Sequence, residues 1–222
     1  MGNRGHSGLR GRASTQDPFG RDAQDRIRIA QVAARLIAEH GIKDWSLAKR
    51  KAVRQLLLPD RAALPGDDEI EAALIDYHAL FGGTLHVAQL RAQREEALRW
   101  MQRLGSFEPV LVGGIAAGWA TAHSDIHLDL TADNAKSVEL ALLNAGVAYR
   151  TMNAADDGPQ RLFIDTPSGG VCLSVRTREE ARQRPRRDRH GEESVRLTAI
   201  ELSALLKATA SLETAEPGNL RT

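Results

Sequence analysis

The chain has 222 residues, which is long enough to bury a substantial core. Thirty lysines and arginines against 29 acidic residues leave a net charge of +1, so the overall charge does not indicate nucleic-acid binding. The single cysteine, Cys172, excludes an intrachain disulfide and is typical of the reducing cytosol. No apolar run reaches the length of a membrane-spanning helix, so the sequence predicts a cytoplasmic protein with no membrane partner.

The first half of the chain is predicted to be helical. A basic tail over residues 1–20 has too few large apolar side chains to fold and is expected to be disordered. Over residues 21–105, apolar residues recur at helical spacing, which predicts four helices in a bundle or a long arm. Gly41 is expected to end the first helix, Ser46 to cap the second and Asp67 to begin the third. The four helices are expected at about 21–40, 46–57, 67–81 and 85–104.

Residues 106–176 are predicted to form a small domain of strands and helices, because the hydrophobic period changes there. Asp125, His127 and Asp129 alternate with apolar residues, which predicts that they share one face of a strand. Two apolar runs on either side of the turn 166–170 predict a hairpin. Strands are expected at about 110–112, 125–130, 147–151, 161–165 and 171–175, with helices at about 115–121 and 133–145.

The remaining segment, 177–222, is predicted to be a basic linker followed by one helix. The linker is expected to extend to about residue 194, and Thr198 is expected to cap a helix that ends near Leu206. Asp133 is expected to cap the helix after the second strand. The predicted fold class is therefore α/β (α+β), with a small mixed sheet, packed helices and a helical N-terminal region.

A glycine turn joins the first two predicted strands, and an acidic strand follows it. Gly113, Gly118, Ser124 and Asp125 stand at fixed places in this strand–turn–helix–strand segment. In identity and spacing they resemble the pattern of the nucleotidyltransferase superfamily of the DNA polymerase beta type, which includes minimal bacterial domains. The resemblance covers roughly residues 106–176. It implies a nucleotidyltransferase-like sheet that holds a nucleoside triphosphate, with Mg²⁺ or Mn²⁺ as the metal if the site is active.

The resemblance also implies a role for individual residues. Gly113, Gly114 and Ser124 would bind the phosphate groups of a nucleotide, because a glycine turn lets backbone N–H groups approach phosphate oxygens. The two family positions on the second strand would hold the divalent metal that aligns the attacking hydroxyl with the α-phosphate. The predicted metal ligands are Asp125 and His127, and the predicted catalytic carboxylates are Asp125 and Asp129.

Two positions in this segment depart from the family pattern. Gly114 stands where the family has a serine, and His127 stands where it has the second aspartate. An imidazole suits Zn²⁺ or Mn²⁺ better than Mg²⁺, which requires hard oxygen ligands. Asp129 lies on the same face but about 6–7 Å farther along the strand, so it cannot replace that carboxylate without moving the metal.

The third acidic position of the family is also missing. It falls on the predicted strand that carries Cys172 and Ser174, which leaves Asp165 across the hairpin as the candidate. Losing one charge contact of this kind costs about 10²–10³ in rate. We therefore expect a degenerate, non-catalytic member, a pseudoenzyme that binds a nucleotide, a nucleic acid or a protein partner.

Two alternative functions stay open. One is an active metal-dependent nucleotidyltransferase that moves a nucleoside monophosphate to an acceptor. The other comes from the stretch 33–48, which resembles the opening of a TetR-type DNA-binding domain, although no recognition turn follows it. In this alternative the basic helix would contact a phosphate backbone or a protein partner. Its basic residues are Lys49, Arg50, Lys51 and Arg54.

Overall fold

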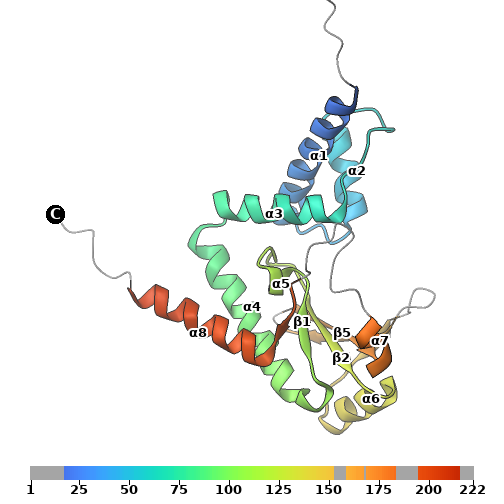
Figure 1. The fold of residues 1–222 in the computed structure, drawn as a ribbon, viewed down its shortest axis with the longest axis vertical. Helices are drawn as coiled ribbons and strands as arrows, with labels where there is room; N and C mark the ends of the chain where they lie inside the picture. The colour runs from blue at the N-terminus through green and yellow to red at the C-terminus, as the bar shows by residue number, and fades with distance from the viewer. Residues whose placement is uncertain (1–17, 153–158, 168, 184–194, 216–222) are drawn as a thin grey trace, which may run out of the picture.

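The computed structural model describes residues 18–152, 159–167, 169–183 and 195–215. Within these residues, eight α-helices and a six-stranded mixed sheet confirm the predicted α/β class with a helical N-terminal region. Three helices form one end of the molecule and the sheet the other, and α4 (Gly83–Arg103) runs between them (Figure 1). No helix in these ranges is long and apolar enough to cross a membrane. The predicted disordered tail lies outside the described residues up to residue 17.

The N-terminal helices pack around α1 (Pro18–His40), which contacts both α2 (Trp45–Gln55) and α3 (Asp67–Phe81). Gly41 has a φ of +64°, as expected for the residue that ends α1. The cap of α2 differs from the prediction. Asp44 accepts a hydrogen bond from the Leu47 N–H at 3.1 Å, and Ser46 lies inside the helix. Aspartate and serine both cap helices well, so the sequence alone does not decide between them.

Helix α4 does not form a four-helix bundle with α1–α3, contrary to the first of the two arrangements predicted. Its second half packs on the sheet, where Ala97, Trp100, Met101 and Leu104 join the sheet core. The predicted helix is therefore confirmed, but its apolar side chains pack against the sheet. The core between α1, α2 and α3 is separate and contains Ile29, Ala33, Ile37, Ala52, Ile70 and Leu74, among others.

The sheet has the strand order β3-β4-β5-β2-β1-β6. Strands β2 and β5 are parallel, and every other neighbouring pair is antiparallel. The hairpin predicted around residues 166–170 is confirmed as β4 and β5. The strands are β1 (Val110–Val112), β2 (Ile126–Thr131), β3 (Arg150–Met152), β4 (Gln160–Thr166), β5 (Gly169–Arg176) and β6 (Leu197–Thr198).

Several elements differ in their bounds from the prediction. Helix α5 (Gly114–Ala117) is one short turn, and α6 (Ala135–Asn144) is capped by Asn134, which accepts a hydrogen bond from the Ser137 N–H, where Asp133 was expected. Helix α7 (Arg178–Gln183) occupies part of the expected linker, whose residues 184–194 lie outside the described ranges. Thr198 caps α8 (Ala199–Ala215) as predicted, but this helix continues past Leu206.

The two faces of the sheet have different compositions because side chains alternate along each strand. The apolar face carries Leu128, Leu162 and Leu173, each fully buried, and packs against α4, α6 and α8. We call the opposite side the polar face. It carries Asp125, His127 and Asp129 from β2 and the residue before it, Cys172, Ser174 and Arg176 from β5, and Arg161, Phe163 and Asp165 from β4.

Candidate functional site

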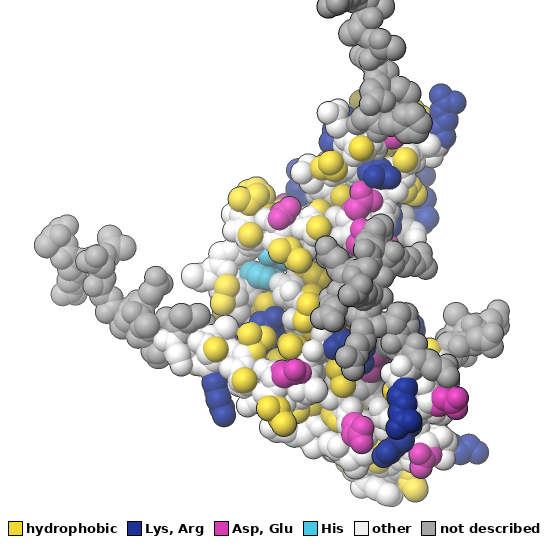
Figure 2. All heavy atoms as spheres, viewed as in Figure 1, with side chains coloured by type: hydrophobic (Ala, Val, Ile, Leu, Met, Phe, Trp, Pro, Cys, Tyr) yellow, Lys and Arg dark blue, Asp and Glu magenta, His cyan; other side chains and the backbone are white. Residues whose placement is uncertain are grey.

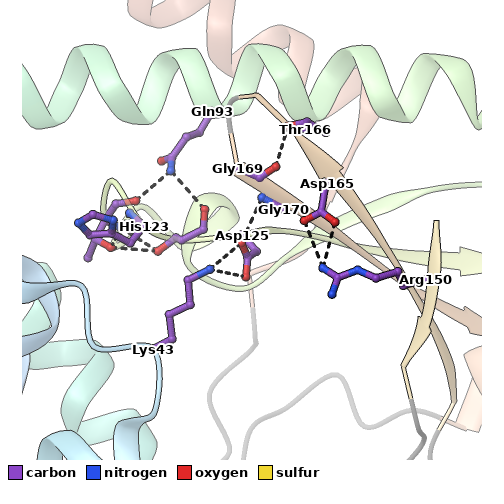
Figure 3. Close-up of polar contacts among 11 residues, drawn as sticks. Lys43, Gln93, His123, Asp125, Arg150, Asp165, Thr166, Gly169 and Gly170 are labelled. Carbon is purple, nitrogen blue, oxygen red and sulfur yellow. Dashed lines mark hydrogen bonds and ion pairs between the residues drawn. The ribbon is translucent and has the colours of Figure 1, made fainter. Parts of the chain in front are cut away.

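Asp125 lies where the N-terminal region meets the start of β2. Both of its carboxylate oxygens accept hydrogen bonds from the Lys43 ammonium at 3.0 Å, and Oδ1 also accepts one from the Gly170 N–H at 3.2 Å (Figure 3). Lys43 comes from the loop between α1 and α2, far from Asp125 in the sequence. A Cβ on Gly170 would lie 2.6 Å from Oδ1 of Asp125, so only glycine lets this backbone approach the carboxylate.

A cavity of about 280 Å³ surrounds this ion pair. Its wall is formed partly by the loop after α1 and partly by the glycine turn and the start of β2. This places it between the helical region and the sheet. The lining residues are Ile37, Gly41, Ile42, Lys43, Trp45, Gly114, Trp119, Thr121, His123, Ser124, Asp125 and His127.

The glycine turn is covered by an aromatic ring. A Cβ on Gly114 would lie 2.6 Å from Cε3 and Cζ3 of Trp119, so the ring fills the space that a serine side chain would need. Trp119 also packs against Trp45, with ring centroids 5.3 Å apart and planes tilted by 60°. The absence of a side chain at position 114 is therefore matched by the position of the Trp119 ring. Gly113 has a φ of +74°, which favours glycine, and it is exposed beside His127 and outside the cavity lining.

Ser124 lines the cavity, but its hydroxyl already has a structural role. Its Oγ accepts a hydrogen bond from the Thr121 N–H at 2.9 Å, and its own N–H donates to the Thr121 carbonyl at 3.1 Å. Gln93 of α4 donates from Nε2 to the same carbonyl at 2.9 Å, as Figure 3 shows. These bonds hold the loop that leads into Asp125 in one conformation. Ser124 therefore fixes the approach to the site as well as forming part of its wall.

His127 lies on the polar face beside Cys172, its register partner on β5. Desolvation by the surrounding strand and turn lowers the pKa of His127. Asp125 raises this pKa, while Arg161 and Lys43 lower it further. His127 is exposed as a residue and lines the cavity, so neighbouring atoms desolvate its ring in part while solvent still reaches it. The imidazole is consequently neutral at neutral pH.

Asp129 is separate from the cavity. It is 6% exposed, and its Oδ2 accepts a hydrogen bond from Nη1 of Arg196 at 3.0 Å. Asp165, the candidate for the third acidic position, is exposed and pairs with Arg150 at 3.0 Å. Figure 3 shows Asp165 and Asp125 with Gly170 between them. The predicted catalytic pair of Asp125 and Asp129 is therefore not assembled around one point.

The donor set around Asp125 does not fit Mg²⁺. Asp125 is already held by an ammonium group, His127 offers nitrogen, and burial raises the pKa of the Cys172 thiol, with Arg161 opposing and Asp125 adding to the shift. A protonated thiol is a poor metal ligand, and Mg²⁺ requires oxygen ligands. The residues that the structure describes contain no group of three or more His, Cys, Asp or Glu side chains placed to hold a metal ion.

Sequence reasoning found part of this site. Gly114, Ser124, Asp125 and His127 all line the cavity, as a common site requires. Lys43 was missed because a lysine in a loop carries no periodic signal. Trp45 and Trp119 pack on each other and also line the cavity. His123 was missed too, although its close contact with Gly41 joins the two walls.

Comparison of the chain with known proteins finds no matching family model and no matching curated protein.

Proposed function

We propose that the chain is a degenerate, nucleotidyltransferase-like protein that binds a nucleotide in the cavity around Asp125 without transferring its phosphate. The observation that carries this proposal is the contact of the Lys43 ammonium with both oxygens of Asp125 at 3.0 Å. A bound cation at this carboxylate offsets its repulsion of a phosphate group, which is one role that a divalent metal has in nucleotide sites. Lys43 supplies such a charge from the chain itself.

The other walls of the cavity suit the remaining parts of a nucleotide. Trp45 and Trp119 provide aromatic surface, on which any base can stack. His123 and His127 provide imidazole groups that can hydrogen bond to ribose or phosphate oxygens. The volume of about 280 Å³ lies near the lower limit of small-molecule sites, which is about 300–1,000 Å³. A small nucleotide is therefore a better match than a long nucleic-acid segment.

The absence of transfer chemistry follows from the carboxylates. Metal-assisted transfer requires carboxylates that can hold divalent cations close to the reacting phosphate. Asp125 pairs with Lys43, and Asp129 pairs with Arg196 on the far side of His127. Each of the two carboxylates predicted to be catalytic is thus paired with a cation of the chain.

Calorimetric titration with ATP, GTP, CTP and UTP tests this proposal, with each nucleotide measured in EDTA and in Mg²⁺. We expect binding in EDTA that Mg²⁺ does not strengthen. Lys43→Ala should weaken it by about tenfold or more, as loss of a charge-assisted hydrogen bond does. Lys51→Ala is the matched control, because Lys51 is an exposed lysine of α2 outside the cavity. No heat with any nucleotide, or equal affinity in both variants, would contradict the proposal.

The same titrations distinguish the alternatives. Binding that requires Mg²⁺ or Mn²⁺, with nucleoside monophosphate transfer that Asp125→Ala abolishes, would identify an active nucleotidyltransferase. His127→Asp sharpens this comparison, because it restores a carboxylate two residues from Asp125. If the Lys43 pair replaces the metal, this variant should gain little Mg²⁺-dependent affinity unless Lys43 is also removed. Binding of DNA without any nucleotide binding would favour the basic face of α2 as the functional surface.

A further inference from the structure

Three arginines converge on the polar face, outside the cavity around Asp125. Arg161 of β4 is the register partner of Ser174 on β5, and Ser174 is in turn the register partner of Asp129 on β2. Arg176 follows Ser174 by two residues and therefore shares its face. Arg196 reaches the same place, because its Nη1 bonds Asp129 at 3.0 Å. Three separate segments thus bring guanidinium groups to one end of the sheet.

Arg176 lies in a partly desolvated place near two other positive charges. Desolvation lowers the pKa of Arg176, Glu180 raises it, and the charges of Arg196 and Arg161 lower it further. In the described chain, Asp129 accepts a hydrogen bond from Arg196, and the charge of Glu180 acts on Arg176. In addition, Nε of Arg176 is buried and has no hydrogen-bond partner among the described residues. Clustered like charges with an unsatisfied donor are characteristic of sites that receive an anion.

A fourth arginine on the same side of the sheet shows the contrast. Arg150 of β3 is exposed, pairs with Asp165 at 3.0 Å and lies over the Phe163 ring. Its positive charge therefore already has a carboxylate and an aromatic ring as partners. Arg161, one strand away, is also exposed but has no ion pair within the described ranges. The two side chains therefore provide a matched pair, in which only one is placed to bind a ligand.

We propose that Arg161, Arg176 and Arg196 form a binding site for a phosphate group. Guanidinium groups match phosphate because their N–H donors form paired, charge-assisted hydrogen bonds with its oxygens. Along the strand, Asp129 lies about 13 Å from Asp125, because four residues separate them. None of the three arginines lines the cavity, so the site does not depend on nucleotide binding there. Its ligand class is a phosphate-bearing anion, which includes both a free polyphosphate and a nucleic-acid strand.

The first experiment measures binding of inorganic pyrophosphate to the full chain by calorimetry. We expect Arg161→Gln to weaken binding by about tenfold or more, while Arg150→Gln leaves it unchanged. Arg161 is exposed, so its substitution should leave the fold intact, and circular dichroism verifies this for both variants. Arg176→Gln provides a second variant, with the same loss expected. Equal affinity of Arg161→Gln and Arg150→Gln, or no pyrophosphate binding by the wild-type chain, would overturn the proposal.

A second arm separates the two sources of phosphate. A short oligothymidylate is titrated in parallel at several salt concentrations. If the ligand is a nucleic-acid strand, it should bind more tightly than pyrophosphate, with an affinity that falls as salt rises and less steeply in Arg161→Gln. If it is a free polyphosphate, pyrophosphate should bind more tightly. Lys43→Ala should leave both results unchanged, so failure of the nucleotide proposal would not be mistaken for failure of this site.

Discussion

The two faces of the sheet differ in how their residues find partners. On the apolar face, Leu128 packs against apolar residues of the neighbouring strands, which the same alternation of polar and apolar residues predicts. On the polar face, the acidic residue of β2 and the one just before this strand each pair with a cation from a distant part of the chain. Asp125 meets Lys43 across a sequence separation of 82 residues, and Asp129 meets Arg196 across 67. The alternating pattern of a strand therefore specifies which face of the sheet a residue lies on. Which charged residue pairs with it depends on the tertiary fold.

The largest expected difference between the faces comes from neighbouring residues of β2. Leu128→Ala should lower the free energy of unfolding by about 2–5 kcal/mol, because Leu128 is fully buried and its truncation leaves a cavity. His127→Ala should cost less than about 1 kcal/mol, since His127 is exposed. Urea unfolding of both variants measures the difference. Similar losses in the two proteins would mean that the polar face is as tightly packed as the apolar one.

The Asp129–Arg196 pair should give the next largest effect. Asp129 is nearly buried, whereas Arg196 is partly exposed. Asp129→Asn should lower the free energy of unfolding by about 2–3 kcal/mol, because it removes the nearly buried negative charge that Arg196 contacts in a partly desolvated place. The double variant Asp129→Asn, Arg196→Gln should recover part of this loss. If the double variant is no more stable than the single one, the two side chains are not coupled.

A serine in place of Gly114 should destabilise the glycine turn. Gly114→Ser places a side chain where the Trp119 ring lies 2.6 Å from the Cβ position, so we expect a loss of about 1–3 kcal/mol from overpacking. Trp119→Leu in the same chain should relieve the overlap and return part of the stability. Thermal unfolding followed by circular dichroism provides the measurement. A serine variant as stable as the wild type would show that Trp119 moves aside at little cost.

Much of the fold could be predicted because local patterns specify it. The alternation of polar and apolar residues predicted β2 and the hairpin. The acidic residues at the start of α3 and the glycine after α1, Gly41, predicted where those helices begin and end. Neighbouring residues with equal capping ability could not be separated from sequence. For this reason the sequence did not identify Asp44 as the cap of α2 or Asn134 as the cap of α6. Strand β6 has two residues, too few to show any period.

The candidate site was less predictable than the fold. Its family-like residues lie within one segment, so spacing alone brought Ser124, Asp125 and His127 together. Lys43 enters from a loop whose path depends on the packing of α1 against α2, and no local pattern reports such a path. The cover of Gly114 by Trp119 likewise depends on where the helical region meets the sheet. Chemistry that arises at such a junction requires the three-dimensional structure.

A smaller, pH-dependent effect is expected at the junction of α3 and α4. Burial lowers the pKa of His78 to about 4, the charge of His86 adds to the shift, and a backbone group of Trp119 opposes it. The two imidazole rings are stacked, with centroids 3.7 Å apart. Because the pKa of folded His78 lies below the unfolded value of 6.5, the unfolded chain binds the proton more readily between these values.

The stability provided by neutral His78 should therefore be complete above pH about 6.5 and be lost as the pH falls toward about 4. His78→Phe keeps a stacked ring but cannot take up a proton. Urea unfolding across this pH range should show a shallower decline in the variant than in the wild type, by less than about 1.4 kcal/mol per pH unit. Parallel declines would assign the pH dependence to other groups.

The smallest effect is expected at the exposed Arg150–Asp165 pair. Both side chains are about two-thirds or more exposed, so water and salt screen their attraction. Asp165→Asn should change the free energy of unfolding by less than about 1 kcal/mol, and the change should shrink as salt is added. The same substitution at Asp129, where the carboxylate is nearly buried, should keep its larger cost at every salt concentration. Measuring both variants in low and high salt therefore separates a surface ion pair from one that organises the polar face. If Asp165→Asn proved the more costly of the two, depth of burial would not rank the ion pairs of this sheet.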